Sequence, residues 1–194
     1  MEFLQTRRRP IELLRYAGLF AWLCATVPLL LMRFWYPEPL DSETYVGWWI
    51  LHMLFGFTYW NQVRELPVRT SLPHRLLILS ILTICALGVS LTSSTSLGGI
   101  LLLIIGGLLP WMLPNAAAGA WLIGQNILLV LAINQIPDIA FADAAFTGAV
   151  FLGISLFAFM SGIVSIRQYE ARDLLHKVNS ELRATQALLA DNTR

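Results

Sequence analysis

Residues 144–166 read AAFTGAVFLGISLFAFMSGIVSI, an apolar run without a charged side chain. About 20 residues of this kind cross the ~30 Å hydrocarbon core of a bilayer as an α-helix. Residues 167–194 follow at once and read RQYEARDLLHKVNSELRATQALLADNTR, a charged stretch without glycine or proline. Because no helix breaker interrupts the junction, the two stretches predict one helix that spans a membrane and continues into water.

Charged residues are scarce in the rest of the chain as well. Only 13% of the 194 residues are charged and 57% are hydrophobic, whereas a soluble domain carries roughly 25% charged residues. Between Phe34 and Arg167 the Lys and Arg residues are limited to three arginines, Arg64, Arg69 and Arg75. A water-soluble fold cannot cover so long a segment with so little polar surface, so we expect the bilayer to be its solvent.

Residues 1–166 contain six apolar runs, and each run is near the length of a transmembrane helix. Only Pro114, Asn115 and their neighbours separate the fourth run from the fifth, so a re-entrant pair is the alternative to two full spans there. We expect an all-α membrane protein in which residues 1–166 form a six-transmembrane-helix sensor bundle. Its spans are expected at about 14–34, 45–63, 76–92, 97–113, 116–134 and 144–166.

The distribution of positive charge predicts how these spans are oriented, because Lys and Arg accumulate in cytoplasmic segments. With the N-terminus inside, Arg33 is the one Lys or Arg residue of the 13 that falls in an outer segment. The inner segments then hold Arg7, Arg8, Arg9, Arg15, Arg64, Arg69, Arg75, Arg167, Arg172, Lys177, Arg183 and Arg194. We therefore expect both termini to lie in the cytoplasm.

Residues 167–194 carry a narrow apolar seam typical of a coiled coil. The seam residues recur at spacings of three and four, as the a and d positions of a heptad do. They are Leu175, Val178, Leu182, Thr185 and Leu189. We expect this segment to be a cytoplasmic coiled-coil linker through which two copies form a homodimer. The alternative is an amphipathic helix on the inner leaflet, which the lack of Trp and Phe disfavours.

Polar side chains inside the apolar runs are the first candidates for a functional site. His52 lies near the middle of the second run, and Gln125 and Asn126 lie near the middle of the fifth. Trp48 and Tyr59 share a helical face with His52. Polar groups at this depth normally face the protein interior, so we predict an intramembrane polar or ligand site made by these residues. The alternative is hydrogen bonding and aromatic packing that only hold the helices together.

Small residues recur along the sixth run, at one- or two-turn spacing, and allow another helix to approach closely. They include Gly148, Ser155, Ala158 and Gly162. This face could contact a second copy of the chain or a neighbouring span of the same protomer. The sequence leaves both possibilities open.

Recognisable catalytic motifs are absent from the sequence, which has no Gly-rich phosphate loop, no HExxH and no GxSxG. Cys24 and Cys85 lie in apolar runs without the spacing of metal ligands. His176 is followed by Lys177, whereas a kinase phosphoacceptor His is normally followed by an acidic residue. We expect no catalytic residue, cofactor or metal in this chain, and no nucleic-acid partner.

The layout resembles bacterial sensor histidine kinases of the DesK-like class, most sharply over EARDLLHKVNSELRATQALLADN, residues 170–192. This stretch is similar to the linker just before the phosphoacceptor box of that class. The resemblance implies an N-terminal membrane-sensor module, truncated before the phosphoacceptor domain, in the bacterial cytoplasmic (inner) membrane. It also implies a full-length kinase that uses ATP and Mg and acts on a response regulator through parts absent from this chain.

Two functions therefore fit the sequence. The first is a sensor that detects a membrane-borne or lipophilic signal, since no loop is long enough for an extracellular domain, and relays it through the last span. The second is a small polytopic transporter or channel, for which the polar residues in the spans and the break at Pro110 and Pro114 would speak. A membrane-embedded enzyme is a third and weaker possibility, because a nucleophile, base or metal set is lacking.

Overall fold

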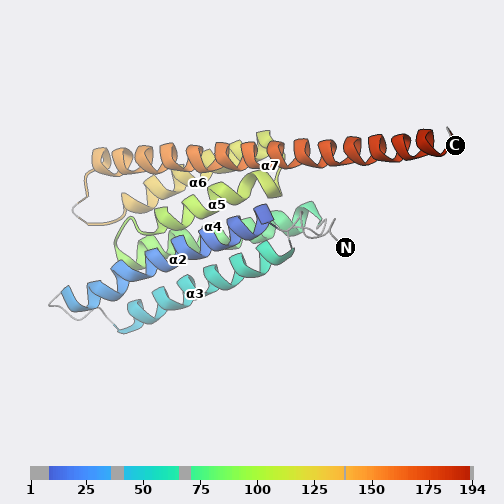
Figure 1. Ribbon diagram of the computed structural model, residues 1–194. Coiled ribbons are helices and arrows are strands. Elements are labelled where there is room, and N and C mark those ends of the chain that lie inside the picture. The colour runs from blue at the N-terminus through green and yellow to red at the C-terminus, as the bar shows by residue number, and fades with distance from the viewer. Residues whose placement is uncertain (1–8, 36–41, 66–70, 138, 193–194) are drawn as a thin grey trace.

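The computed structural model describes residues 9–35, 42–65, 71–137 and 139–192. Every regular element in these ranges is a helix, in the order α2 (Arg9–Trp35), α3 (Ser42–Glu65), α4 (Leu72–Ser93), α5 (Gly98–Met112), α6 (Asn115–Ile133) and α7 (Phe141–Asn192). Figure 1 shows them as an elongated bundle from which the second half of α7 extends. The predicted all-α fold is confirmed, and each helix covers one of the six apolar runs.

Three of the described helices are long and apolar enough to cross a membrane: α4, α6 and the part of α7 within Phe141–Arg183. α5 is apolar but has only 15 residues, which reach about 22 Å. α2 and α3 are longer than α6, with 27 and 24 residues. Length and composition therefore support a membrane protein and single out three of the six expected spans.

α5 lies at the centre of the bundle and packs against α2, α4, α6 and α7. α3 packs on the outer side, against α4 and α2. Six large side chains of α5 are fully buried: Leu101, Leu102, Ile105, Leu108, Leu109 and Met112. A helix so enclosed meets mainly protein, so its short length exposes little backbone to the surroundings.

The ends of the central helices follow from local sequence. Pro73 occupies the first turn of α4, where its missing N–H is no loss. At the other end, Ser94 adopts a left-handed conformation with φ of 50° and stops the helix. The hydroxyls of Thr92 and Ser93 donate to the carbonyls of Gly88 and Val89, at 2.8 and 2.6 Å. The hydroxyl-rich run at this point is thus a helix terminus and turn.

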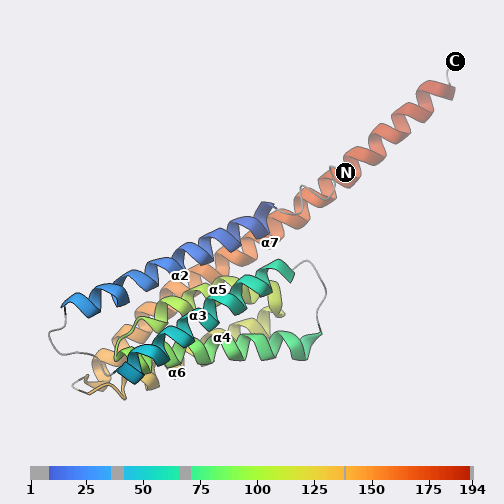
Figure 2. The same cartoon turned by 90° about the horizontal axis from the view of Figure 1, so that it is seen from below.

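α7 is a single helix of 52 residues. Its first half packs against α5 and α6, and its second half continues beyond the bundle in both views (Figures 1 and 2). The lack of glycine and proline after Gly162 predicts this continuity, and the helix is indeed unbroken through Asn192. We call its extended part, residues 167–192, the linker.

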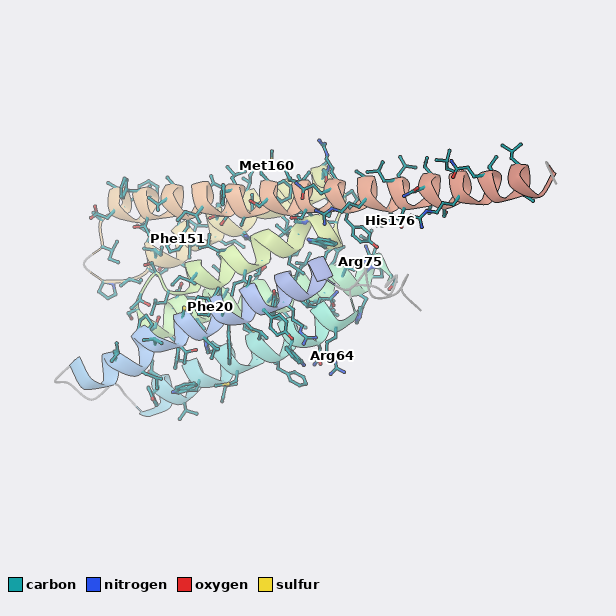
Figure 3. The ribbon with its side chains drawn as sticks, viewed as in Figure 1. Phe20, Arg64, Arg75, Phe151, Met160 and His176 are labelled. Carbon is teal, nitrogen blue, oxygen red and sulfur yellow. The ribbon has the colours of Figure 1, made fainter. Side chains whose placement is uncertain are left out.

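The small residues of α7 face the rest of the same chain. A Cβ added at Gly162 would lie 3.0 Å from Pro110 Cγ and 3.2 Å from the carbonyl oxygen of Gly107, both on α5. One added at Gly148 would overlap Val130 of α6. Figure 3 shows Phe151 on the bundle side of α7 and Met160 on the opposite side. The sequence leaves open whether this face contacts a second copy of the chain or a neighbouring span. In the structure, Gly148 and Gly162 contact neighbouring helices of the same protomer.

Replacing Gly162 with Leu should destabilise the bundle by about 1–3 kcal/mol, because the side chain would have to push α7 away from Pro110. Gly124 on α6 is the matched control, since no atom lies within 4 Å of a Cβ built there. Unfolding of purified protein by SDS titration would measure both variants. Equal stability of Gly162→Leu and Gly124→Leu would contradict the close α5–α7 contact.

Candidate functional site

His52 lies on the face of α3 that meets α2, and its side chain is fully buried. Its Nε2 is 2.7 Å from the hydroxyl oxygen of Thr26 on α2. A second bond joins the same helices in the other direction, because the indole N–H of Trp22 donates to the carbonyl oxygen of His52 at 3.0 Å. Two polar contacts therefore fix α2 against α3 at one level of the bundle.

Tryptophan rings enclose the imidazole on both faces. The ring of Trp22 stacks on it with a centroid distance of 4.9 Å and an interplanar angle of 12°. Trp48 stacks at 5.3 Å and 20°, and Trp49 meets it edge-on at 6.4 Å. We call Trp22, Thr26, Trp48, Trp49 and His52 the histidine–tryptophan cluster. Such stacking holds the imidazole plane in one orientation.

The hydrogen bonds of the cluster also assign its protons. Thr26 Oγ1 lies 3.0 Å from the carbonyl oxygen of Trp22 and donates its one proton there. For the neutral imidazole, His52 Nε2 must then donate to Thr26, which leaves Nδ1 as an acceptor. Among the described residues this Nδ1 has no hydrogen-bond partner, and neither has the buried indole N–H of Trp48.

An unused acceptor and an unused donor thus lie one helical turn apart inside the bundle. Leaving such a group buried without a partner costs about 1–3 kcal/mol. A hydroxyl or a water molecule can accept from the indole N–H and can donate to Nδ1, so each atom is chemically suited to a small polar group. The same atoms are also compatible with a cluster that only packs.

Gln125 and Asn126 lie elsewhere, on α6. The Gln125 amide donates to the carbonyl oxygen of Leu102 on α5 at 3.3 Å, and the Asn126 amide donates to Leu122 within α6 at 2.8 Å. Both side chains are buried, and their amide oxygens have no partner among the described residues. Ser155 of α7 is likewise buried with an unpartnered hydroxyl.

The structure therefore separates the predicted polar centre into two groups. His52 makes its contacts with α2 and with its own helix, together with Trp48. Gln125 contacts α5. Tyr59 is fully buried on α3, stacks with Phe55 at 6.4 Å, and abuts Gly18 of α2. The aromatic face of α3 is thus a packing face against α2.

Two members of the cluster, Trp22 and Thr26, are missed by reasoning from the sequence. The available signal is the spacing of Gly18, Trp22 and Thr26, which recur every four residues and so share one face of α2. A small residue, an indole and a hydroxyl on one face suggest a contact with another helix. Nothing in the sequence of α2 alone indicates that this other helix is α3.

The linker carries the predicted coiled-coil residues on its surface. All five seam residues, Leu175, Val178, Leu182, Thr185 and Leu189, are exposed in the single chain. The described ion pair of the linker joins Lys177 and Asp173 at 3.2 Å, one turn apart and off the seam. Homodimerisation through this seam stays a prediction.

No family model, curated protein or solved structure matches this chain. We therefore infer its function from three features of its own geometry. These are the histidine–tryptophan cluster, the close contact of α5 with α7, and the linker.

A double-mutant cycle tests the bond between Thr26 and His52. Thr26→Val keeps the shape of Thr26 and His52→Phe keeps a flat ring, but each removes one partner of the bond. The coupling energy should be about 0.6–2 kcal/mol, as for other hydrogen bonds between membrane helices, measured by SDS unfolding. Thr26→Ser is the control that retains the hydroxyl, and strictly additive losses would argue against the bond.

Proposed function

We propose that the chain is a homodimeric transmembrane signalling module, in which a six-span bundle responds to a membrane-borne or lipophilic signal and α7 relays that response to the cytoplasm. The main support is the form of α7, one unbroken helix of 52 residues. Its first half packs against α5 and α6, and its second half extends from the bundle. A rigid helix transmits rotation and translation over its whole length, which a flexible connection does not.

The arrangement of charges supports six spans with both ends inside. Arg64 and Arg75 lie at the end of the bundle from which α7 emerges, and His176 of the linker lies beyond that end (Figure 3). Arg75 also donates to the carbonyl oxygen of Met112 at 3.0 Å, where α5 ends. Asp143 begins α7 at the opposite end. This gathering of positive charge at one end is typical of a cytoplasmic face, although Arg7, Arg8, Arg69 and Arg194 lie outside the described residues.

The surface of the bundle supports a signal that arrives through lipid. Large apolar side chains are exposed on five helices, among them Phe20, Phe57, Ile84, Ile127 and Phe157. A mismatch between such a surface and the bilayer costs fractions of a kcal/mol per Å. Summed over a dimer, a change in thickness would bias two arrangements of α7 by about a few kcal/mol, enough to shift their populations.

In the full-length protein this module would control a histidine kinase of the DesK-like class, in the bacterial cytoplasmic membrane. ATP, Mg and a response regulator would then act on parts beyond this chain. The support for this step is the resemblance of residues 170–192 to the kinase linker and the helical, exposed form of that segment.

A small transporter or channel is the second candidate, and one observation favours it. Pro110 lies inside α5 and has no N–H to bond the carbonyl of Gly106. α5 packs against α6 and α7, which carry the unpartnered amide oxygens of Gln125 and Asn126 and the unpartnered hydroxyl of Ser155. Broken helices with buried polar groups are typical of transport sites. Uptake of ions or small solutes into vesicles that contain the protein would support this alternative.

Topology can be tested by accessibility labelling of single cysteines in a variant without Cys24 and Cys85. Cysteines at Ser94 and Ala140, both exposed ends of helices, should react with an impermeant thiol reagent added outside the cell. A cysteine at Ser71 should react only after the membrane is opened. Labelling of Ser94 from the cytoplasmic side alone would overturn the proposed orientation.

The sensing role predicts that lipid thickness changes the linker. Protein with a single cysteine at Val178 would be reconstituted in vesicles of phosphatidylcholines with short or long acyl chains, and oxidative cross-linking would be measured. The cross-linked fraction should differ between thin and thick bilayers, while a cysteine at Ser180, on the opposite side of the linker, should stay weakly cross-linked. Strong cross-linking that is the same in every lipid would speak for a passive anchor.

A further inference from the structure

The bundle-bound half of α7 has two distinct faces. Its buried residues are Ala144, Gly148, Ser155, Phe159 and Gly162, all on the side that meets α5 and α6. The seam of the linker can be followed back along the same helix because α7 is unbroken. At about 100° per residue, the centre of the seam lies roughly 150° around the helix from the centre of the buried face.

The heptad register gives the residues that continue the seam. Counting back in steps of seven from Thr185 and Val178 reaches Ala171, Val164, Phe157 and Val150, and every one of these side chains is exposed in the single chain. Phe157, at 74%, is among the most exposed large apolar side chains of the protein. Each step of seven drifts by about 20° on a straight helix, or about 100° over the five steps from Val150 to Thr185, so the line stays on the half of the helix that faces away from the bundle.

Two polar residues point to what covers this face. Ser161 and Gln168 fall at the alternate positions of the same register, fourteen and seven residues before Leu175 respectively, and both are exposed. A hydrocarbon neighbour offers Ser161 nothing to bond, and Gln168 continues the same line into the start of the linker. An identical helix offers the same group across a two-fold axis, as polar a-position residues do in coiled coils.

We propose that two copies of α7 pack in parallel along their whole length, so that the dimer contact runs from the linker through the membrane. The contact line is Val150, Phe157, Val164, Ala171, Val178 and Thr185. This inference rests on the homodimer of the proposed function and adds where that dimer meets inside the bilayer. α7 then lies between its own bundle on one side and the partner helix on the other. The histidine–tryptophan cluster lies on α2 and α3, which take no part in this contact.

Single cysteines in a variant without Cys24 and Cys85 provide the test, in native membranes of cells that express the whole chain. Cysteines at Val150, Phe157 and Val164 should each give a disulfide-linked dimer on mild oxidation. Cysteines at Leu152 and Ser165, which point to the sides of the same helix, are matched controls and should give at least several-fold less. The replaced contact-line side chains are exposed in the single chain, so the variants should retain the fold.

A cysteine at Val178 separates this inference from the proposed dimer itself. If Val178 cross-links and the three membrane positions do not, the dimer stands but lipid covers the outward face of α7, and the inference fails. If none of the four cross-links, both the dimer and the inference fail. Equal cross-linking at Leu152, Ser165 and the contact line would indicate random collision and would also overturn it.

Discussion

Gly162 of α7 lies so close to α5 that a single added carbon would meet the ring of Pro110 and the carbonyl oxygen of Gly107. The rest of the arrangement depends on this contact, together with that of Gly148 on Val130. In lipid there is little hydrophobic gain from bringing two helices together, so close backbone approach and packing must hold them. With its small-residue face used in this way, α7 presents large apolar residues such as Val150, Phe157 and Val164 outward and leaves the bundle as one helix.

The position of α5 gives this contact its functional meaning. α5 packs on α2, α4, α6 and α7, so in the proposed function a displacement of the outer helices would reach α7 through it. The histidine–tryptophan cluster joins α2 and α3 at the far side of this path. In our account the outer helices meet the lipid, the enclosed α5 carries their movement, and α7 delivers it to the linker. The unpartnered atoms of His52 and Trp48 would let a small polar group tighten or loosen the outer pair.

The sequence predicts those features that one helix determines by itself. Apolar runs mark all six helices, and the absence of helix breakers after Gly162 predicts the length of α7. Features that need two helices are not predictable in the same way. The partners of His52 come from α2, and Gln125 lies against α5, so one supposed polar centre becomes two. Likewise, only packing decides that Gly148 and Gly162 face their own protomer.

The central claim is that the bundle-bound half of α7, with its contact line, and the linker form one rigid helix, so that the rotation of one part fixes the rotation of the other. It is tested most directly by inserting alanines between Arg167 and Gln168 and measuring, in thin and thick bilayers, oxidative cross-linking of single cysteines introduced at Phe157 and at Val178. Two residues rotate the linker by about 200° relative to the bundle, whereas seven restore its phase to within about 20°. Our account predicts that, after the two-residue insertion, the cross-link at Phe157 or at Val178 is lost or no longer depends on lipid. The seven-residue insertion should restore both cross-links and their dependence on lipid. An identical response for all insertion lengths would contradict it.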